Sequence, residues 1–279
     1  MPLKNIILLL GTIFLLSACN WKKSVSSVKN TEITQKSDYQ LVWSDEFDYT
    51  GLPDSTKWIY DTEGNSEGWG NSEAQYYTIA KKENAWVENG VLNITALKEQ
   101  FEGKEYTSAR LNSRANWLCG KIEVNAKLPE GRGTWSAIWM MPADWSFNDG
   151  NWPNIGEIDI MEHVGYNLGA IHASAHSKDY QWQTNTQQTD TIHISDVAEK
   201  FHSYIWEWTP EVMKAYVDDQ LYFEYKNEGL GESKWPYVKP FYLILNVAVG
   251  GVWGSVEGID KQAFPQTMQV DYVRIYQKK

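Results

Sequence analysis

Short segments in which apolar and polar residues alternate recur through most of the chain. Because successive side chains of a strand point to opposite faces, each such segment predicts a strand with one buried face. The clearest segments are residues 91–96, 120–127, 202–208 and 212–217. The last of these continues through Asp218-Asp219-Gln220 into residues 221–225, and the turn residues between the two runs predict a β-hairpin.

Helical periodicity is almost missing from the sequence. Residues 195–200 form the one short stretch that predicts a helix, with Ser195 as its N-cap. The sequence contains no internal repeat and no sign of a second domain. The pattern therefore predicts an all-β sandwich in one domain that spans residues 39–279.

The first residues have a different pattern, typical of a targeting segment. A lysine precedes an apolar run at residues 6–16, which is too short for a stable transmembrane helix. The run ends in Leu16-Ser17-Ala18-Cys19, which resembles a bacterial lipobox; the alternative is an ordinary secretory signal that contains a cysteine. A lipobox implies a signal peptide at 1–18, a lipid on Cys19 and a flexible tether at 19–38. The protein is then an exported bacterial lipoprotein, anchored to a membrane in the periplasm or on the cell surface.

Composition narrows the class of partner. The chain has 15 Trp and 16 Tyr residues, more than core packing needs, which indicates a surface that stacks on planar or sugar rings. The formal net charge of -11 argues against nucleic acid, whose phosphates require a basic face, whereas a neutral polysaccharide makes no such demand. Cys119 is the only cysteine besides Cys19, so a lipid on Cys19 leaves no intramolecular disulfide.

Three carboxylates lie within six residues of an apolar run, at Glu157, Asp159 and Glu162. In a regular strand Glu157 and Asp159 share a face, with isoleucines on the other. Glu162 breaks this parity and would point into the apolar side, where an unpaired carboxylate is costly. A one-residue bulge near Ile160-Met161 would return Glu162 to the face of the other two, and bulges are over-represented beside active sites.

Carboxylates crowded on one face repel one another and separate in pKa, so that one can donate a proton while another stays ionised. Retaining glycoside hydrolysis needs this division, with a nucleophile and an acid/base about 5–5.5 Å apart. Two other interpretations of the triplet are an exposed acidic edge and a calcium site built from oxygen ligands.

The segment 156–162, Gly-Glu-Ile-Asp-Ile-Met-Glu, resembles the E-x-D-x-x-E signature of glycoside hydrolase family 16, in the bulged form of its laminarinases. The resemblance runs from about Leu41 to Tyr276. It implies a β-jelly-roll sandwich of two curved antiparallel sheets, with a substrate cleft on the concave sheet. It also implies that Glu157 is the nucleophile, Glu162 the general acid/base and Asp159 the residue that tunes the nucleophile.

The same resemblance implies residues that hold the sugar. Trp135 and Trp139 share a strand face around Ala137, as cleft residues or as core tryptophans. Asn71 matches a laminarinase segment that contacts the non-reducing side, and its other interpretation is a turn residue. Arg110 matches an arginine that reaches a sugar hydroxyl, with a structural salt bridge as the alternative.

Two further positions complete the expected cleft. His172 and His176 lie four apart, but no third ligand of the right type stands nearby, as a zinc site would require. The resemblance places His176 beside the carboxylates, and the alternative is a core histidine. Trp253, after the paired glycines Gly250-Gly251, is expected to stack on sugar.

The family resemblance also implies a structural calcium ion, which catalysis does not need. By this resemblance its ligands would be Glu46, the carbonyl of Gly90 and Asp271, which offer the oxygen atoms that suit calcium. We expect no other metal or cofactor.

Two functions from different classes follow. The first is a monomeric, retaining endo-β-1,3-glucanase acting on laminarin-type glucans, with mixed-linkage β-1,3-1,4-glucan as an alternative substrate. The second is a lipoprotein that captures β-glucan on the same concave sheet without cutting it. The complete triad favours the enzyme, since a binding protein does not need three mutually repelling carboxylates.

Overall fold

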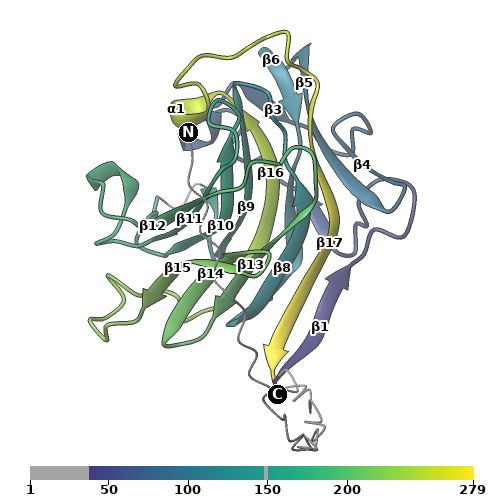
Figure 1. The fold of residues 1–279 in the computed structure, drawn as a ribbon. Helices are drawn as coiled ribbons and strands as arrows, with labels where there is room; N and C mark the ends of the chain where they lie inside the picture. Colours follow the sequence, from purple (N-terminus) through teal and green to yellow (C-terminus); the bar gives the residue numbers. More distant parts are fainter. Residues whose placement is uncertain (1–37, 148–149) are drawn as a thin grey trace, which may run out of the picture. The chain divides into compact units, whose positions relative to one another are not determined.

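Two sheets packed against each other make up the fold of this protein in a computed structural model, which describes residues 38–147 and 150–279 (Figure 1). One sheet has ten strands and the other seven, and all their pairings are antiparallel except that of β3 with β6. The predicted signal peptide, Cys19 and nearly all of the predicted tether lie outside the described residues. No helix in the described ranges is both long and apolar enough to cross a membrane.

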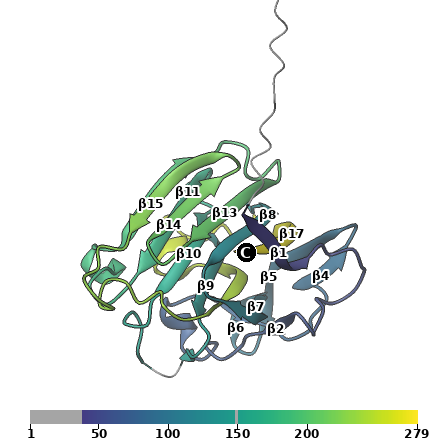
Figure 2. The same ribbon diagram turned by 90° about the horizontal axis from the view of Figure 1, so that it is seen from below.

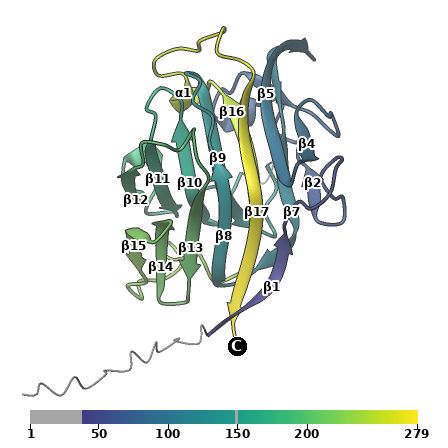
Figure 3. The ribbon, with the colours of Figure 1, turned by 45° about the vertical axis from the view of Figure 1, so that its right-hand side comes forward.

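The ten-stranded sheet has the order β15-β14-β13-β8-β17-β5-β6-β3, with β1 added to β17 and β4 to β5. Figure 3 shows the strands of this sheet from β15 to β17, with β1 beside β17. Its strands are β1 (Tyr39–Asp45), β3 (Gln75–Tyr77), β4 (Ala85–Glu88), β5 (Val91–Phe101), β6 (Lys104–Ser108), β8 (Gly120–Lys127), β13 (His202–Trp208), β14 (Val212–Val217), β15 (Gln220–Lys226) and β17 (Gln266–Lys278). The seven-stranded sheet has the order β12-β11-β10-β9-β16-β7-β2. Its strands are β2 (Trp58–Tyr60), β7 (Arg110–Trp117), β9 (Thr134–Pro142), β10 (Glu157–Val164), β11 (Ala170–His176), β12 (Gln188–His193) and β16 (Phe241–Val249). Short helical turns are η1 (Gly68–Gly70), η3 (Trp182–Thr184) and α1 (Gly251–Gly254).

The core lies between the two sheets, whose ribbon Figure 2 shows from below. On β8 the apolar residues Ile122, Val124 and Ala126 are fully buried, whereas the polar residues between them are half-buried. Each large apolar side chain removed from water in this way stabilises the fold by about 1.5–3 kcal/mol. The alternation that predicted the strand is therefore also the pattern that fills the core.

The predicted strands β8, β13 and β14 have the bounds that the alternation gave them. β14 and β15 form the predicted hairpin, in which Val217 pairs with Gln220 and Asp218 adopts a φ of 53° in the turn. Aspartate is one of the few residues that tolerates this left-handed conformation. With the two-sheet architecture, these elements confirm the predicted all-β class.

The helix predicted at residues 195–200 is wrong. This segment is a turn in which the backbone N–H groups of Glu199 and Lys200 both donate to the carbonyl of Asp196 at 2.9 Å. Val197 is fully buried in the core. Six residues provide too few hydrogen bonds to offset the cost of helix nucleation, so packing of Val197 determines the local shape.

Candidate active site

Strand β10 contains the one-residue bulge that the parity of Glu162 predicted. In the pairing with β9, Asp159 and Met161 oppose adjacent residues, so Ile160 is the extra residue. Both Ile160 and Met161 are buried in the core. Glu162 is thereby returned to the face of Glu157, and this prediction is confirmed.

All three carboxylates line one cavity of about 680 Å³. Its walls come from β7, β16, β9, β10, β11 and β12, so it crosses the seven-stranded sheet with β10 near the middle. The loops that carry η1, η3 and α1 add to the walls. A cavity that crosses so many strands can accommodate a chain of sugar units rather than one terminal ring.

Each carboxylate of the triad has its own hydrogen-bonding partner. Trp135 donates from Nε1 to Oε1 of Glu162 at 3.0 Å, and Trp152 donates from Nε1 to Oε2 of Glu157. The third carboxylate, on Asp159, lies 3.2 Å from His176 Nε2 and is only 2% exposed. The structure thus brings His176, which faces Glu157 on the paired strand β11, to the carboxylates.

Burial raises the pKa values of all three acids, and repulsion by Asp159 adds to the effect on Glu157 and Glu162. Loss of solvation, followed by the charge of Asp159, raises the pKa of Glu157 to about 8. Burial raises the pKa of Asp159 to about 7. Burial and the charge of Asp159 hold the pKa of Glu162 well above its usual range. Near neutral pH the site therefore retains protons, as a general acid requires, and the nucleophile must give up its proton before it attacks.

On one side of β10, Arg110 of β7 lies between two indole rings. Its guanidinium carbon is 4.4 Å from the ring centre of Trp69 and 4.7 Å from that of Trp139, and its Nε is 3.0 Å from Oδ2 of Asp61. The ion pair of the second sequence interpretation is present, and Arg110 also lines the cavity; its contact with a sugar hydroxyl stays a prediction. Trp139 in turn donates to Oδ1 of Asn246 at 2.7 Å, which fixes the plane of the indole.

Asn71 lies on the same side of β10, and hydrogen bonds to neighbouring residues fix its position. Its side-chain amide donates to Glu73 Oε1 at 3.3 Å, and Gln75 Nε2 donates to the other oxygen of Glu73 at 2.6 Å. The carbonyl of Asn71 accepts from the backbone N–H of Val252 at 2.8 Å. Desolvation raises the pKa of Glu73 to about 7. Asn71 is therefore both a turn residue and part of the cavity wall, joined to the loop that carries Trp253.

Trp253 packs edge-on against two other cavity residues. Its ring centre is 5.5 Å from that of Trp135 and 4.9 Å from that of His172. His172 pairs across the strands with Glu162, and its Nδ1 bonds Thr191 Oγ1 at 2.9 Å. The sequence-predicted residues Trp135, Trp139 and Trp253 are thus all brought to the cavity, and their contact with sugar stays a prediction.

Sequence reasoning assigned no role to several residues that the structure places at the site: Trp69, Glu73, Trp152 and His172. The sequence could have indicated a site role for Trp152, because this residue stands five residues before Glu157 in the same motif. Glu73 had no comparable signal. Its position depends on an isolated bridge to Gly250, which is far away in the sequence.

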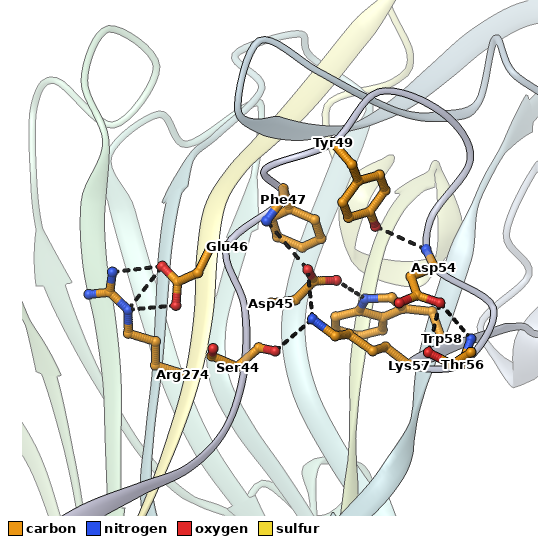
Figure 4. A network of polar contacts seen from close by, with 10 residues as sticks. All are labelled: Ser44, Asp45, Glu46, Phe47, Tyr49, Asp54, Thr56, Lys57, Trp58 and Arg274. Carbon is orange, nitrogen blue, oxygen red and sulfur yellow. Dashed lines mark hydrogen bonds and ion pairs between the residues drawn. The ribbon is translucent and has the colours of Figure 1, made fainter.

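Glu46, the first of the residues proposed for calcium, is engaged by an arginine. Its carboxylate accepts three hydrogen bonds of 2.7 to 3.2 Å from Arg274, which lowers its pKa (Figure 4). Arg274 therefore already neutralises this side chain, which does not fit the role of a calcium ligand. Gly90 lies between β4 and β5 and Asp271 is half-buried on β17. Calcium binding stays a prediction.

Comparison with known proteins relates the chain to one family. The model of glycosyl hydrolases family 16 matches residues 72–274. The chain is 51% identical over 245 residues to a beta-glucanase of Rhodothermus marinus, covering 85% of each protein. It is 37% identical over 256 residues to a glucan endo-1,3-beta-glucosidase of Cryptopygus antarcticus, covering 84% of this chain and 90% of that one. The X-ray structure of the laminarinase from Rhodothermus marinus matches with a TM-score of 0.82 and 50% identity, over 86% of this chain and 97% of the other.

Proposed function

The chain belongs to glycosyl hydrolases family 16, and from this premise we propose that it cleaves internal β-1,3-glucosidic bonds of laminarin-type glucans with retention of configuration. The observation that carries the proposal is the bulged strand β10, which presents three carboxylates with three different partners to one cavity. The similarity to a laminarinase and to a glucan endo-1,3-beta-glucosidase supports β-1,3-glucan as the substrate.

In the first step Glu162 protonates the departing glycosidic oxygen while Glu157 attacks the anomeric carbon. Burial keeps the proton on Glu162 until a substrate oxygen takes it, because the pKa of this group is held high. Hydrogen bonding from Trp152 favours the ionised form of Glu157. Asp159 and Glu157 affect each other's pKa, and when Asp159 rather than Glu157 is protonated, Glu157 is free to attack.

The second step releases the glycosyl group from Glu157. Glu162, now a carboxylate, removes a proton from the attacking water, and the sugar leaves with the configuration it had at the start. Trp135 positions Glu162 for these proton transfers, because its Nε1–H donates to Oε1 of that carboxylate in the resting site. No cofactor takes part in this chemistry.

A neutral glucan suits the electrostatics of the cavity. Arg110 is the only lysine or arginine that lines it within the described ranges, and Asp61 pairs with that charge. Sulfated or carboxylated chains would require additional cations. Mixed-linkage β-1,3-1,4-glucan meets the same electrostatic condition and is the alternative substrate for the same chemistry.

The direct test measures reducing ends released from laminarin by the full chain and by Glu157→Gln, with mixed-linkage glucan and agarose in parallel. We expect release from laminarin that falls at least about thousandfold in the variant, because the amide cannot form the glycosyl-enzyme. Binding to laminarin with no release from any of these substrates would favour the capture protein.

We further propose that Cys19 carries a lipid and anchors the enzyme to a bacterial membrane. The support is the lipobox-like sequence Leu16-Ser17-Ala18-Cys19 alone. Expression in a bacterial host, followed by fractionation of cells that make the chain or Cys19→Ser, tests it. The unsubstituted protein should sediment with membranes and incorporate labelled palmitate, and the variant should do neither. Equal behaviour of the two would refute the anchor.

A further inference from the structure

The connection between β11 and β12 places an exposed tryptophan at one end of the cavity. Trp182, in the short turn η3, is 44% exposed and lines the cavity together with Gln183, Gln187 and Thr189. This end lies across β10 from Arg110, because β11 and β12 follow β10 in the sheet on the side opposite β9, β16 and β7. None of these four residues was singled out by the sequence.

The turn that carries Trp182 is tied together by hydrogen bonds. The backbone N–H of Thr186 donates to the carbonyl of Gln181 at 3.0 Å, and that of Asn185 donates to the carbonyl of Trp182 at 3.0 Å. Thr186 Oγ1 accepts from the backbone N–H of Gln181 at 3.1 Å. Asn185 adopts a φ of 55°, which asparagine tolerates, and closes the turn. The indole is therefore presented on a preformed turn, which lowers the entropy lost on binding.

The Trp182 ring is 44% exposed and, among the described residues, is not held by another aromatic ring or by a hydrogen bond. Within the described part of the chain, Trp182 makes no ring contact with another aromatic residue, and its N–H has no hydrogen-bond acceptor. An exposed indole contributes little to the core, whereas an indole face beside a cleft offers a large flat area to a ring with an apolar face.

Polar groups stand next to the indole. The side-chain oxygen of Gln187 is buried and accepts no hydrogen bond from the residues that the structure describes. Thr189 and Ser174 present a pair of hydroxyl groups 2.9 Å apart. A buried acceptor without a donor costs about 1–3 kcal/mol, and a sugar hydroxyl would supply that donor.

We propose that Trp182 and Gln187 form a further glucosyl-binding subsite at the β12 end of the cleft. The indole covers the C–H face of one ring of the glucan, and the Gln187 oxygen accepts from one of its hydroxyl groups. The ligand is a neutral sugar unit, because no lysine or arginine among the described residues lines this end. This inference rests on the proposed function and specifies where the polysaccharide continues beyond the triad.

The test is calorimetric binding of laminariheptaose to the full chain in the Glu157→Gln background, with and without Trp182→Ala. We expect the dissociation constant to rise about tenfold with Trp182→Ala, because one stacked ring is lost. Trp182→Phe keeps a flat ring and should retain most of the affinity. The matched control is Phe201→Ala, since Phe201 is 38% exposed and lies outside the cavity; it should leave affinity unchanged.

Chain length gives a second readout. Laminariheptaose should lose more affinity than laminaritriose on Trp182→Ala, because only a long chain must extend to the end of the cleft. Equal affinity of the Trp182→Ala and unsubstituted proteins for laminariheptaose would overturn the subsite while leaving the proposed function intact. If the unsubstituted protein neither binds nor cleaves laminari-oligosaccharides, the proposed function fails and the subsite fails with it.

Discussion

The two flanks of the cleft, on either side of β10, are built in different ways. On the β9, β16 and β7 flank, Arg110 is held by an ion pair and two indoles, and Trp139 by Asn246. On the β11 and β12 flank, Trp182 is exposed and the Gln187 oxygen has no donor within the described chain. The side chains of the β9, β16 and β7 flank are therefore integrated in the folded core, whereas Trp182 on the β11 and β12 flank is carried by a surface turn.

This difference predicts how function and stability are coupled. Side chains that bind sugar and also satisfy buried neighbours cannot be removed without loss of folding free energy. Side chains that contact only solvent and ligand can be removed at little cost to stability. Substitutions on the two flanks should therefore separate into those that affect both properties and those that affect binding alone.

The largest effect is expected from Arg110→Ala. It removes the ion-pair partner of Asp61, which is 12% exposed and keeps the neutral donors of Asn112 and Glu63, and should lower the free energy of unfolding by about 3 kcal/mol. The kcat/KM for laminarin should fall about hundredfold, through loss of a charged hydrogen-bond donor. Thermal unfolding and reducing-end assays measure the two effects.

A matched control is Lys261→Ala. Lys261 forms an ion pair with Glu105 in which both side chains are more than half exposed, so stability should change by less than about 0.5 kcal/mol. If Arg110→Ala proved as harmless to stability as Lys261→Ala, the proposed difference between the flanks would be lost.

At the centre of the cleft, Trp152→Phe should move the pH profile. The indole N–H favours ionised Glu157, so its removal raises the pKa of that carboxyl. Fewer molecules then hold the nucleophile as a carboxylate at low pH, and the acid limb of kcat/KM should shift upward by about one pH unit. A general disturbance would lower activity at every pH without moving the limb, and that result would exclude this role for Trp152.

A smaller effect concerns stability in the Glu157→Gln variant. The pKa of Glu157 is raised to about 8 in the fold, so the unfolded chain loses this proton first and folding stability falls as pH rises from about 4.5 toward 8. Glutamine removes this penalty. The variant should gain about 1–2 kcal/mol over the unsubstituted protein at pH 8 and nothing at pH 4. Denaturant unfolding at the two pH values measures it, and an equal gain at both would contradict the assignment.

The smallest effect is expected on the other flank. Trp182→Ala should lower the free energy of unfolding by only about 1 kcal/mol, since the side chain is 44% exposed and contacts no other aromatic ring in the described chain. Urea unfolding of the Trp182→Ala and Arg110→Ala variants, measured side by side, gives the two free energies of unfolding to compare. A loss near 3 kcal/mol would mean that the β12 flank is as deeply integrated in the fold as the β7 flank.

The sequence predicted those features that depend on local pattern. Alternation located β8, β13 and β14, and the parity of Glu162 located the bulge in β10. Both inferences use the two-residue period of a strand, which is a property of neighbouring residues. The all-β class and the bulge in β10 could therefore be predicted from local pattern alone, whereas the jelly roll and the residues around the triad were implied by the family resemblance.

What the sequence did not predict depends on contacts between distant segments. Glu73 reaches the cavity because its strand region meets Gly250, and Arg274 reaches Glu46 across the β1–β17 pair. The alternation of polar and apolar residues within one segment carries no information about such contacts between distant segments. The turn at residues 195–200 failed as a helix for the same reason, since burial of Val197 overrode a weak local preference.

The central claim is that Glu157 attacks the sugar, and trapping of the covalent intermediate tests it most directly. The full chain would be incubated with a 2-deoxy-2-fluoro-laminaribiosyl fluoride, digested, and its labelled peptide sequenced by mass spectrometry. The account predicts one fluoro-laminaribiosyl group, attached to the side chain of Glu157. A label on Glu162, or release of product with inverted configuration and no label, would contradict it.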